Sequence, residues 1–160
     1  MVDEPEFTHL DSEGNARMVD VGGKVETQRR AVARAQVKMS IETVVALSAG
    51  NVPKGDVLAA ARLAGIQAAK RTSELVPLCH QVSLGSVIVE LSLASSSVDI
   101  EVRTEAVGRT GVEMEALTGC AVAALTVYDM CKSFDRQMTI EGLGVFEKSG
   151  GRSGPWQRSD

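Results

Sequence analysis

An acidic and a basic side chain lie three residues apart near the end of an apolar segment. Asp129 and Lys132 would share one face of a helix, because residues three apart are neighbours on a helical surface. A carboxylate beside an ammonium can transfer protons if burial tunes the lysine pKa toward neutrality, or the two can form an ordinary ion pair in water. Lys54 is a third candidate, because its Pro-Lys-Gly turn could aim the ammonium at a phosphate or a reacting proton.

A second group of reactive side chains stands at the other end of the same segment. Glu113 and Glu115 fall in the first turn of the expected helix, where carboxylates meet the positive end of the helix dipole. The adjacent Cys79 and His80 point to opposite sides of an extended chain, so they are poorly placed to share a metal. With two histidines and three cysteines but no C-x-x-C pair, we expect reduced thiols and no protein-bound metal.

The helix between the two groups is too long to border one small-molecule site. Glu115 and Asp129 are fourteen residues apart, which is roughly 20 Å at about 1.5 Å per residue. If both groups serve one reaction, the carboxylate end of one helix must approach the Asp-Lys end of a neighbour's helix in a symmetric oligomer. On this hypothesis Lys54 and Asp129 would act from different chains, and variants of the two would complement each other when mixed.

Alternation and helical spacing predict one α+β domain (31–148) between an irregular lead-in (1–30) and a flexible Gly/Ser-rich tail (149–160). The order of elements is that of a ferredoxin-like, split β-α-β fold: an antiparallel sheet with helices on one face. Met138, Ile140, Gly142 and Gly144 are expected on one face of the last strand. The expected strands cover residues 31–39, 87–93, 98–106 and 138–148, and the expected helices cover 41–50, 57–75 and 112–132.

Composition narrows the class of protein. A net charge of -4 and 3% aromatic residues disfavour a nucleic-acid binder. The polar, acidic N-terminus does not resemble a signal peptide and no apolar run reaches about eighteen residues, so we expect no membrane association and a cytosolic location. The Gly108-Arg109-Thr110-Gly111 turn lacks a Gly-Lys-Ser/Thr sequence and is weak evidence for a phosphate loop.

Six segments, in chain order, resemble one protein family. MVDV, KGDVLAAARLAGIQAAKRT, PLCH, TGVEMEALT, AALTVYDMCK and KSGGRSG are similar to the molybdenum-cofactor biosynthesis protein C (MoaC) family, the cyclic pyranopterin monophosphate synthases. The resemblance implies a lyase that converts 3′,8-cyclo-7,8-dihydroguanosine 5′-triphosphate into cyclic pyranopterin monophosphate and releases pyrophosphate. It also implies a homohexamer, built as a trimer of dimers, with active sites between subunits.

The resemblance also assigns site residues by motif. Asp129 and Lys132 match the catalytic pair, with Lys54 as a further acid–base candidate. The expected substrate contacts are Leu78, Cys79, His80, Glu113, Met114, Glu115 and Lys148, with Lys70 and Arg71 as additional candidates. One departure is Gln81, where many family members have proline. We expect no cofactor beyond Mg²⁺ that accompanies the triphosphate.

Two other functions fit the residues without the resemblance. The chain could be a non-catalytic ligand-binding or assembly module whose charged residues are solvated. It could also be an ordinary nucleotide phosphohydrolase. The identity of the product separates these alternatives from a pterin-forming enzyme.

Overall fold

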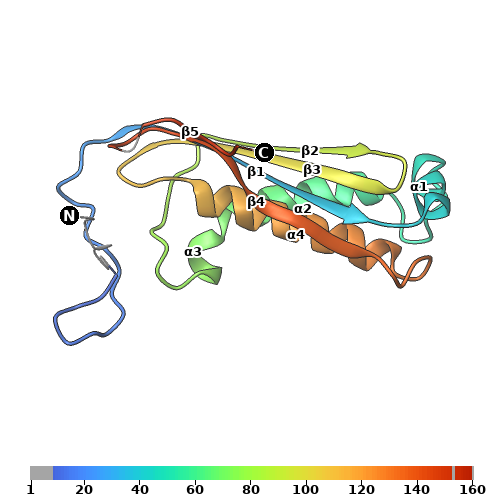
Figure 1. The fold of residues 1–160 in the computed structure, drawn as a ribbon, viewed down its shortest axis with the longest axis horizontal. Helices are drawn as coiled ribbons and strands as arrows, with labels where there is room; N and C mark the ends of the chain where they lie inside the picture. Colours follow the sequence, from blue (N-terminus) through green and yellow to red (C-terminus); the bar gives the residue numbers. More distant parts are fainter. Residues whose placement is uncertain (1–8, 153, 160) are drawn as a thin grey trace.

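The long helices lie along one side of an antiparallel sheet. The structure is a computed structural model and describes residues 9–152 and 154–159. In chain order, these residues form β1 (Thr27–Lys38), α1 (Ile41–Ser48), α2 (Val57–Lys70), α3 (Thr72–Leu75), β2 (Ser86–Leu93), β3 (Ser97–Gly108), α4 (Glu113–Cys131), β4 (Thr139–Ser149) and β5 (Trp156–Gln157). Figure 1 shows α2 and α4 beneath the sheet and α1 beyond one end of it.

The strands lie in the order β2-β3-β1-β4-β5, and every neighbouring pair is antiparallel. β1 and β2 are therefore parallel to each other, with β3 between them. β3 and β4 are parallel in the same way and are separated by β1. Helical crossovers of the same hand explain why α2 and α4 share one face of the sheet. The predicted α+β class, with its antiparallel sheet, is confirmed.

α4 fills the space under the middle of the sheet. It packs against β1 and β3 on one side and α2 on the other. A Cβ added at Gly65 in α2 or at Gly119 in α4 would lie 3.0 Å from the other glycine's carbonyl oxygen. This close crossing explains why each helix tolerates an internal glycine, which costs about 1 kcal/mol relative to alanine.

By length and composition alone, α4 could cross a membrane, since its mean hydropathy is 1.2. Its place in the fold accounts for that composition, because the inward face of α4 belongs to the core beneath the sheet. Cys120 and Cys131 lie on this face as buried free thiols. Burial raises the pKa of Cys120 to about 12, as expected for a structural thiol.

The largest differences from the expected elements lie at the start of the first strand, in the tail and at the end of the second helix. β1 begins at Thr27, within the lead-in, and β5 pairs with β4 from within the tail. The helix expected over residues 57–75 ends at Lys70, and the short α3 follows it. Arg71 leaves helical geometry there, with φ -112° and ψ 14°, while the Thr72 hydroxyl donates to the Ala69 carbonyl at 3.0 Å. Local side-chain hydrogen bonding of this kind competes with helix continuation.

The prediction that Ile140 and Gly144 share one face of the last strand is wrong. Ile140 pairs with the buried Val37, whereas Gly144 pairs with Arg34 on the solvent side of the sheet. The register shifts between these two pairs, and Gly142 there has a positive φ of 65°. The shift is a β-bulge, whose extra residue reverses the alternation of side chains beyond it.

Candidate active site

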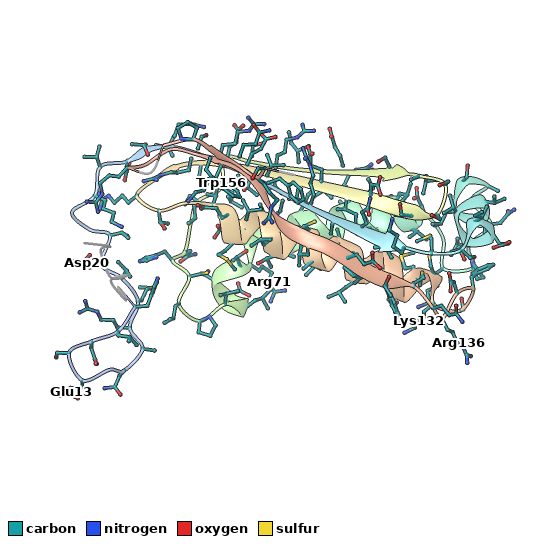
Figure 2. The ribbon with its side chains drawn as sticks, in the orientation of Figure 1. Glu13, Asp20, Arg71, Lys132, Arg136 and Trp156 are labelled. Atoms are coloured by element: carbon teal, nitrogen blue, oxygen red, sulfur yellow. The ribbon has the colours of Figure 1, made fainter. Side chains whose placement is uncertain are left out.

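Three charged side chains meet at the carboxyl end of α4. Asp129 Oδ1 lies 2.6 Å from Lys132 Nζ, and Asp129 Oδ2 lies 2.8 Å from Lys54 Nζ. Lys54 comes from the turn before α2 and also donates to the Asp129 carbonyl oxygen at 2.9 Å. The two lysines border a cavity of about 410 Å³ together with Arg136. Figure 2 shows Lys132 and Arg136 at this end of the molecule. We call Lys54, Asp129 and Lys132 the lysine cluster.

The charges of the lysine cluster stabilise one another in their ionised forms. Hydrogen bonds from Lys132 and Lys54 lower the pKa of Asp129 to about 2. The hydrogen bond with Asp129 raises the pKa of Lys132. The condition for proton transfer, burial that tunes the pKa of Lys132 toward neutrality, is not met in a single subunit, in which its side chain is 56% exposed. The prediction that Lys54 and Asp129 act from different chains is wrong, because an ion pair joins them within one chain.

The other end of α4 borders a cavity of about 440 Å³, which we call the histidine cavity. The structure brings together here the side chains predicted from the PLCH and VEME segments. They are Leu78, Cys79, His80, Glu113, Met114 and Glu115. His80 Nε2 lies 2.7 Å from the carbonyl oxygen of Val19. A carbonyl oxygen only accepts, so Nε2 is the protonated nitrogen, and Nδ1 remains to accept or donate.

A buried carboxyl group dominates the electrostatics of the histidine cavity. Glu115 is only 4% exposed, and burial, followed by the charge of Glu113, raises its pKa. Burial and the charge of Glu115 also raise the pKa of Cys79. The Cys79 side chain is therefore a neutral thiol, which is a weak nucleophile. The cavity is suited to binding a polar ring through hydrogen bonds to the Glu115 carboxyl group.

An adjoining cavity of about 810 Å³ is lined by cationic side chains, and we call it the basic cavity. The cations come from the segment before β1, from β1 itself, from the turn before α4 and from the end of β4 and the residues after it. They are Lys24, Arg29, Arg109, Lys148 and Arg152. Among the described residues that line it, Glu113 is the only carboxylate. This distribution of charge is suited to a polyanion such as a chain of phosphates.

Glu113 belongs to both cavities. It lines each of them together with Thr110 and Gly111, which lie in the turn before α4. Its Oε1 lies 3.1 Å from Lys148 Nζ, and both side chains are about one-third exposed (29% and 33%). Lys148 reaches this point because it pairs with the buried Ala31 on β1, and paired residues point to the same face of a sheet.

Sequence reasoning found Lys148 but missed the other four cations of the basic cavity. Arg29 Nε donates to the Gly108 carbonyl at 3.1 Å, which holds its side chain beside the turn before α4. Arg109 lies in that turn, so a turn that was weak evidence for a phosphate loop does carry a cation to this cavity. The Gly-Arg sequences in GRTG and KSGGRSG were the sequence signal that could have indicated Arg109 and Arg152.

Lys70 and Arg71 are the predicted residues that the subunit does not bring to these cavities. Arg71 Nε lies 2.8 Å from Glu74 Oε2, and both side chains are largely exposed. Lys70 is exposed at the end of α2. Neither residue lines the three cavities described above. Figure 2 shows Arg71 beside α3, away from Lys132.

Comparison with known proteins identifies the family. The sequence of residues 18–151 matches the sequence model of the MoaC family. The chain belongs to the MoaC family. A cyclic pyranopterin monophosphate synthase of Roseiflexus sp. (strain RS-1) is 58% identical over 151 residues, which cover 93% of this chain and 96% of that protein. The enzyme of the same name from Thermomicrobium roseum is 57% identical over 97% of this chain and 95% of its own length. A third, from Novosphingobium aromaticivorans, is 50% identical over 97% and 99%. The MoaC match spans the lysine cluster and every lining residue of the two cavities except His9 and Arg152.

Proposed function

We propose that the protein is a cyclic pyranopterin monophosphate synthase, a lyase of molybdenum cofactor biosynthesis. It converts 3′,8-cyclo-7,8-dihydroguanosine 5′-triphosphate into cyclic pyranopterin monophosphate and pyrophosphate. The observation that carries this proposal is a basic cavity joined to a carboxyl-lined cavity at Thr110, Gly111 and Glu113. The substrate has the matching parts, a triphosphate and a guanine-derived ring. The names of the relatives, which are 50–58% identical, supply the reaction.

The basic cavity is proposed to hold the triphosphate. Arg29 and Arg109 offer planar guanidinium groups that can bind phosphate oxygens in pairs. Lys148 adds a charge beside them. Attack of a substrate hydroxyl on the α-phosphate closes the cyclic phosphate and expels pyrophosphate, so these cations stabilise the negative charge that develops on the leaving group. Mg²⁺ accompanying the triphosphate would be held by phosphate oxygens and water. Among the described residues, no three His, Cys, Asp or Glu side chains gather into a metal site.

The histidine cavity is proposed to hold the ring. The Glu115 carboxyl group can accept hydrogen bonds from the amidine-like edge of a guanine derivative when it is ionised. Hydrogen bonds from the N–H groups of this edge favour the ionised carboxylate and would offset part of the burial that raises the pKa of Glu115. His80, whose Nε2 is held by the Val19 carbonyl, presents its other nitrogen as a donor or acceptor.

The lysine cluster is proposed to supply proton transfer. Two ammonium groups share one carboxylate there, so the cluster carries one excess positive charge. Burial against a neighbouring subunit would disfavour that excess charge and would lower the pKa of a lysine rather than protonate Asp129. The covered cluster would then hold one neutral lysine, which can act as a general base near neutral pH.

An antiparallel pairing of two α4 helices is proposed to bring the two ends together. Much of the outer side of α4 is apolar and accessible, and the exposed residues Met114, Leu125 and Asp129 lie along it with the partly exposed Ala121 between them. These positions are spaced seven, four and four residues apart and therefore share one face. A twofold axis near Ala121 would set the lysine cluster of one subunit against the rim of the histidine cavity at the partner's Met114.

Family membership and free thiols extend this proposal to the assembly and its location. Three such dimers would form the homohexamer that the family resemblance implies. The thiols of Cys79, Cys120 and Cys131 are free, which suits a reducing, cytoplasmic environment.

Product analysis tests the proposed function. The purified protein is incubated with the cyclised dihydroguanosine triphosphate while pyrophosphate and pterin are followed together. We expect one pyrophosphate for each cyclic pterin, with loss of both products in Asp129→Asn and full activity in Arg71→Ala, a matched surface-cation control. A simple nucleoside phosphate would indicate a phosphohydrolase instead. Failure to form any product would favour the binding module.

A further inference from the structure

The carboxylate of Glu113 lies in the space that a side chain at Gly111 would fill. A Cβ added at Gly111 would overlap Glu113 Oε2 and would lie 2.7 Å from Cδ and 2.9 Å from Oε1 of the same side chain. The whole Glu113 carboxylate therefore occupies the space of a side chain at position 111. Gly111 does not have the positive φ that favours glycine, so its backbone geometry would accept alanine.

The space at Gly111 lets the Glu113 carboxylate reach Lys148. Glu113 turns back toward the residues before α4, and there its Oε1 lies 3.1 Å from Lys148 Nζ. The ion pair stands at the boundary where the histidine cavity and the basic cavity meet, and Gly111 lines both. The carboxylate forms an ion pair with Lys148, one of the cations of the basic cavity. It also lines the histidine cavity, where it can contact a bound ring.

We propose that Gly111 is a positioning residue. Because it has no side chain, it leaves the space in which the Glu113 carboxylate lies against Lys148 at the boundary between the two cavities. The proposal rests on the proposed function in that it assigns the ring to one cavity and the phosphates to the other. Gly111→Ala would move the carboxylate away and release Lys148. The colliding atoms are the end of a flexible side chain, so the fold itself would be retained.

Two opposite effects distinguish positioning from general damage. Release of Lys148 from its partner makes the basic cavity more attractive to anions, so inorganic pyrophosphate should bind Gly111→Ala about threefold to fivefold more tightly. Turnover should fall about tenfold, because the substrate ring loses a charged hydrogen-bond acceptor. A merely structural defect would weaken pyrophosphate binding and turnover together.

A double-mutant cycle tests the proposal with pyrophosphate as the probe. Pyrophosphate affinity by calorimetry and turnover are measured for wild type, Gly111→Ala, Glu113→Ala and the double variant. We expect both single variants to shift in the same directions and the double variant to match Glu113→Ala, because removal of the carboxylate leaves Gly111 nothing to position. Gly85→Ala is the matched control, since a Cβ there would meet only the Glu105 carbonyl oxygen at 3.6 Å.

The affinity arm remains informative if the proposed reaction is wrong. A wild-type protein without turnover would contradict the proposed function, while the cycle in pyrophosphate affinity would still test Gly111. Additive effects in the double variant, or weaker pyrophosphate binding by Gly111→Ala, would overturn the positioning role. If Gly111→Ala alone does not fold, the double variant must fold as Glu113→Ala does. Failure of the double variant would show that Gly111 is needed for another reason.

Discussion

Lys54 Nζ and Asp129 Oδ2 lie 2.8 Å apart, although 75 positions separate the two residues in the chain. The turn before α2 and the last turn of α4 form this contact, and Lys132 completes it from the other oxygen of the carboxylate. An Asp129 carboxyl with a pKa of about 2 is a poor proton acceptor at neutral pH. In the proposed mechanism the lysines therefore transfer the protons, and Asp129 orients them.

Asp129→Asn should abolish most activity and leave the fold intact. The amide keeps the shape of the side chain but cannot hold two ammonium groups, so we expect kcat to fall by about 10² to 10⁴. The Tm should hardly change, because exposed ion pairs contribute little to stability. Steady-state kinetics and thermal unfolding measure the two effects. Activity within a few-fold of wild type would rule out the role given to Asp129.

Arg29→Ala should weaken binding of the triphosphate. One lost charged hydrogen-bond donor corresponds to about a tenfold or larger rise in KM, with a smaller effect on kcat. Arg71→Ala provides the control, because Arg71 is an exposed cation that lies outside the basic cavity. The substrate dependence of the initial rate gives both constants. An equal KM in the two variants would place the triphosphate elsewhere.

Glu115→Gln should make the protein more stable and less active at neutral pH. Burial raises the pKa of Glu115 in the folded state. A raised carboxyl pKa means that stability is lost as pH rises through the folded pKa, since the charged form is then buried. The Tm of Glu115→Gln should therefore exceed that of wild type at pH 7, and the difference should vanish below about pH 4. A Tm below that of wild type at pH 7 would show that the ionised carboxylate is stabilised instead.

Leu125→Asp should dissociate the proposed α4 pairing. Leu125 is 56% exposed in the single subunit and lies near the middle of the outer face of α4. Burial of a charge there costs several kcal/mol, so light scattering should report smaller particles and turnover should fall with them. Val45→Asp is the control, because Val45 is exposed on α1, which lies beyond the end of the sheet in Figure 1. An unchanged mass with Leu125→Asp would place the interface on another face.

Periodicity predicted most of the fold because its signals are local. The alternation along the β2–β3 hairpin and the apolar length of α4 require no knowledge of distant residues. The break after Lys70 and the bulge at Gly142 were missed, because a single hydroxyl hydrogen bond and a single positive φ set them. Neither feature leaves a periodic trace in the sequence.

Sequence reasoning predicted those parts of the candidate site that come from a short segment with several reactive residues. The PLCH and VEME segments are of this kind, and the histidine cavity contains the predicted side chains. The basic cavity was largely missed, because its cations come from segments far apart in the chain that only the folded structure brings together. Lys54 could not be placed with Asp129 for the same reason, since their contact joins two distant turns.

The central claim is that one active site uses the lysine cluster of one subunit and the histidine cavity of another. Asp129→Asn and Glu115→Gln, whose separate activities are measured first and subtracted, are mixed in equal amounts, allowed to exchange subunits and assayed for pterin. Half of the dimers would then be mixed, and each mixed dimer would contain one intact site of two, so about a quarter of wild-type activity should return. Lys54→Ala mixed with Asp129→Asn should restore none, because both changes damage the same cluster. If exchange is verified by mass spectrometry and the first mixture stays inactive, the shared site is contradicted.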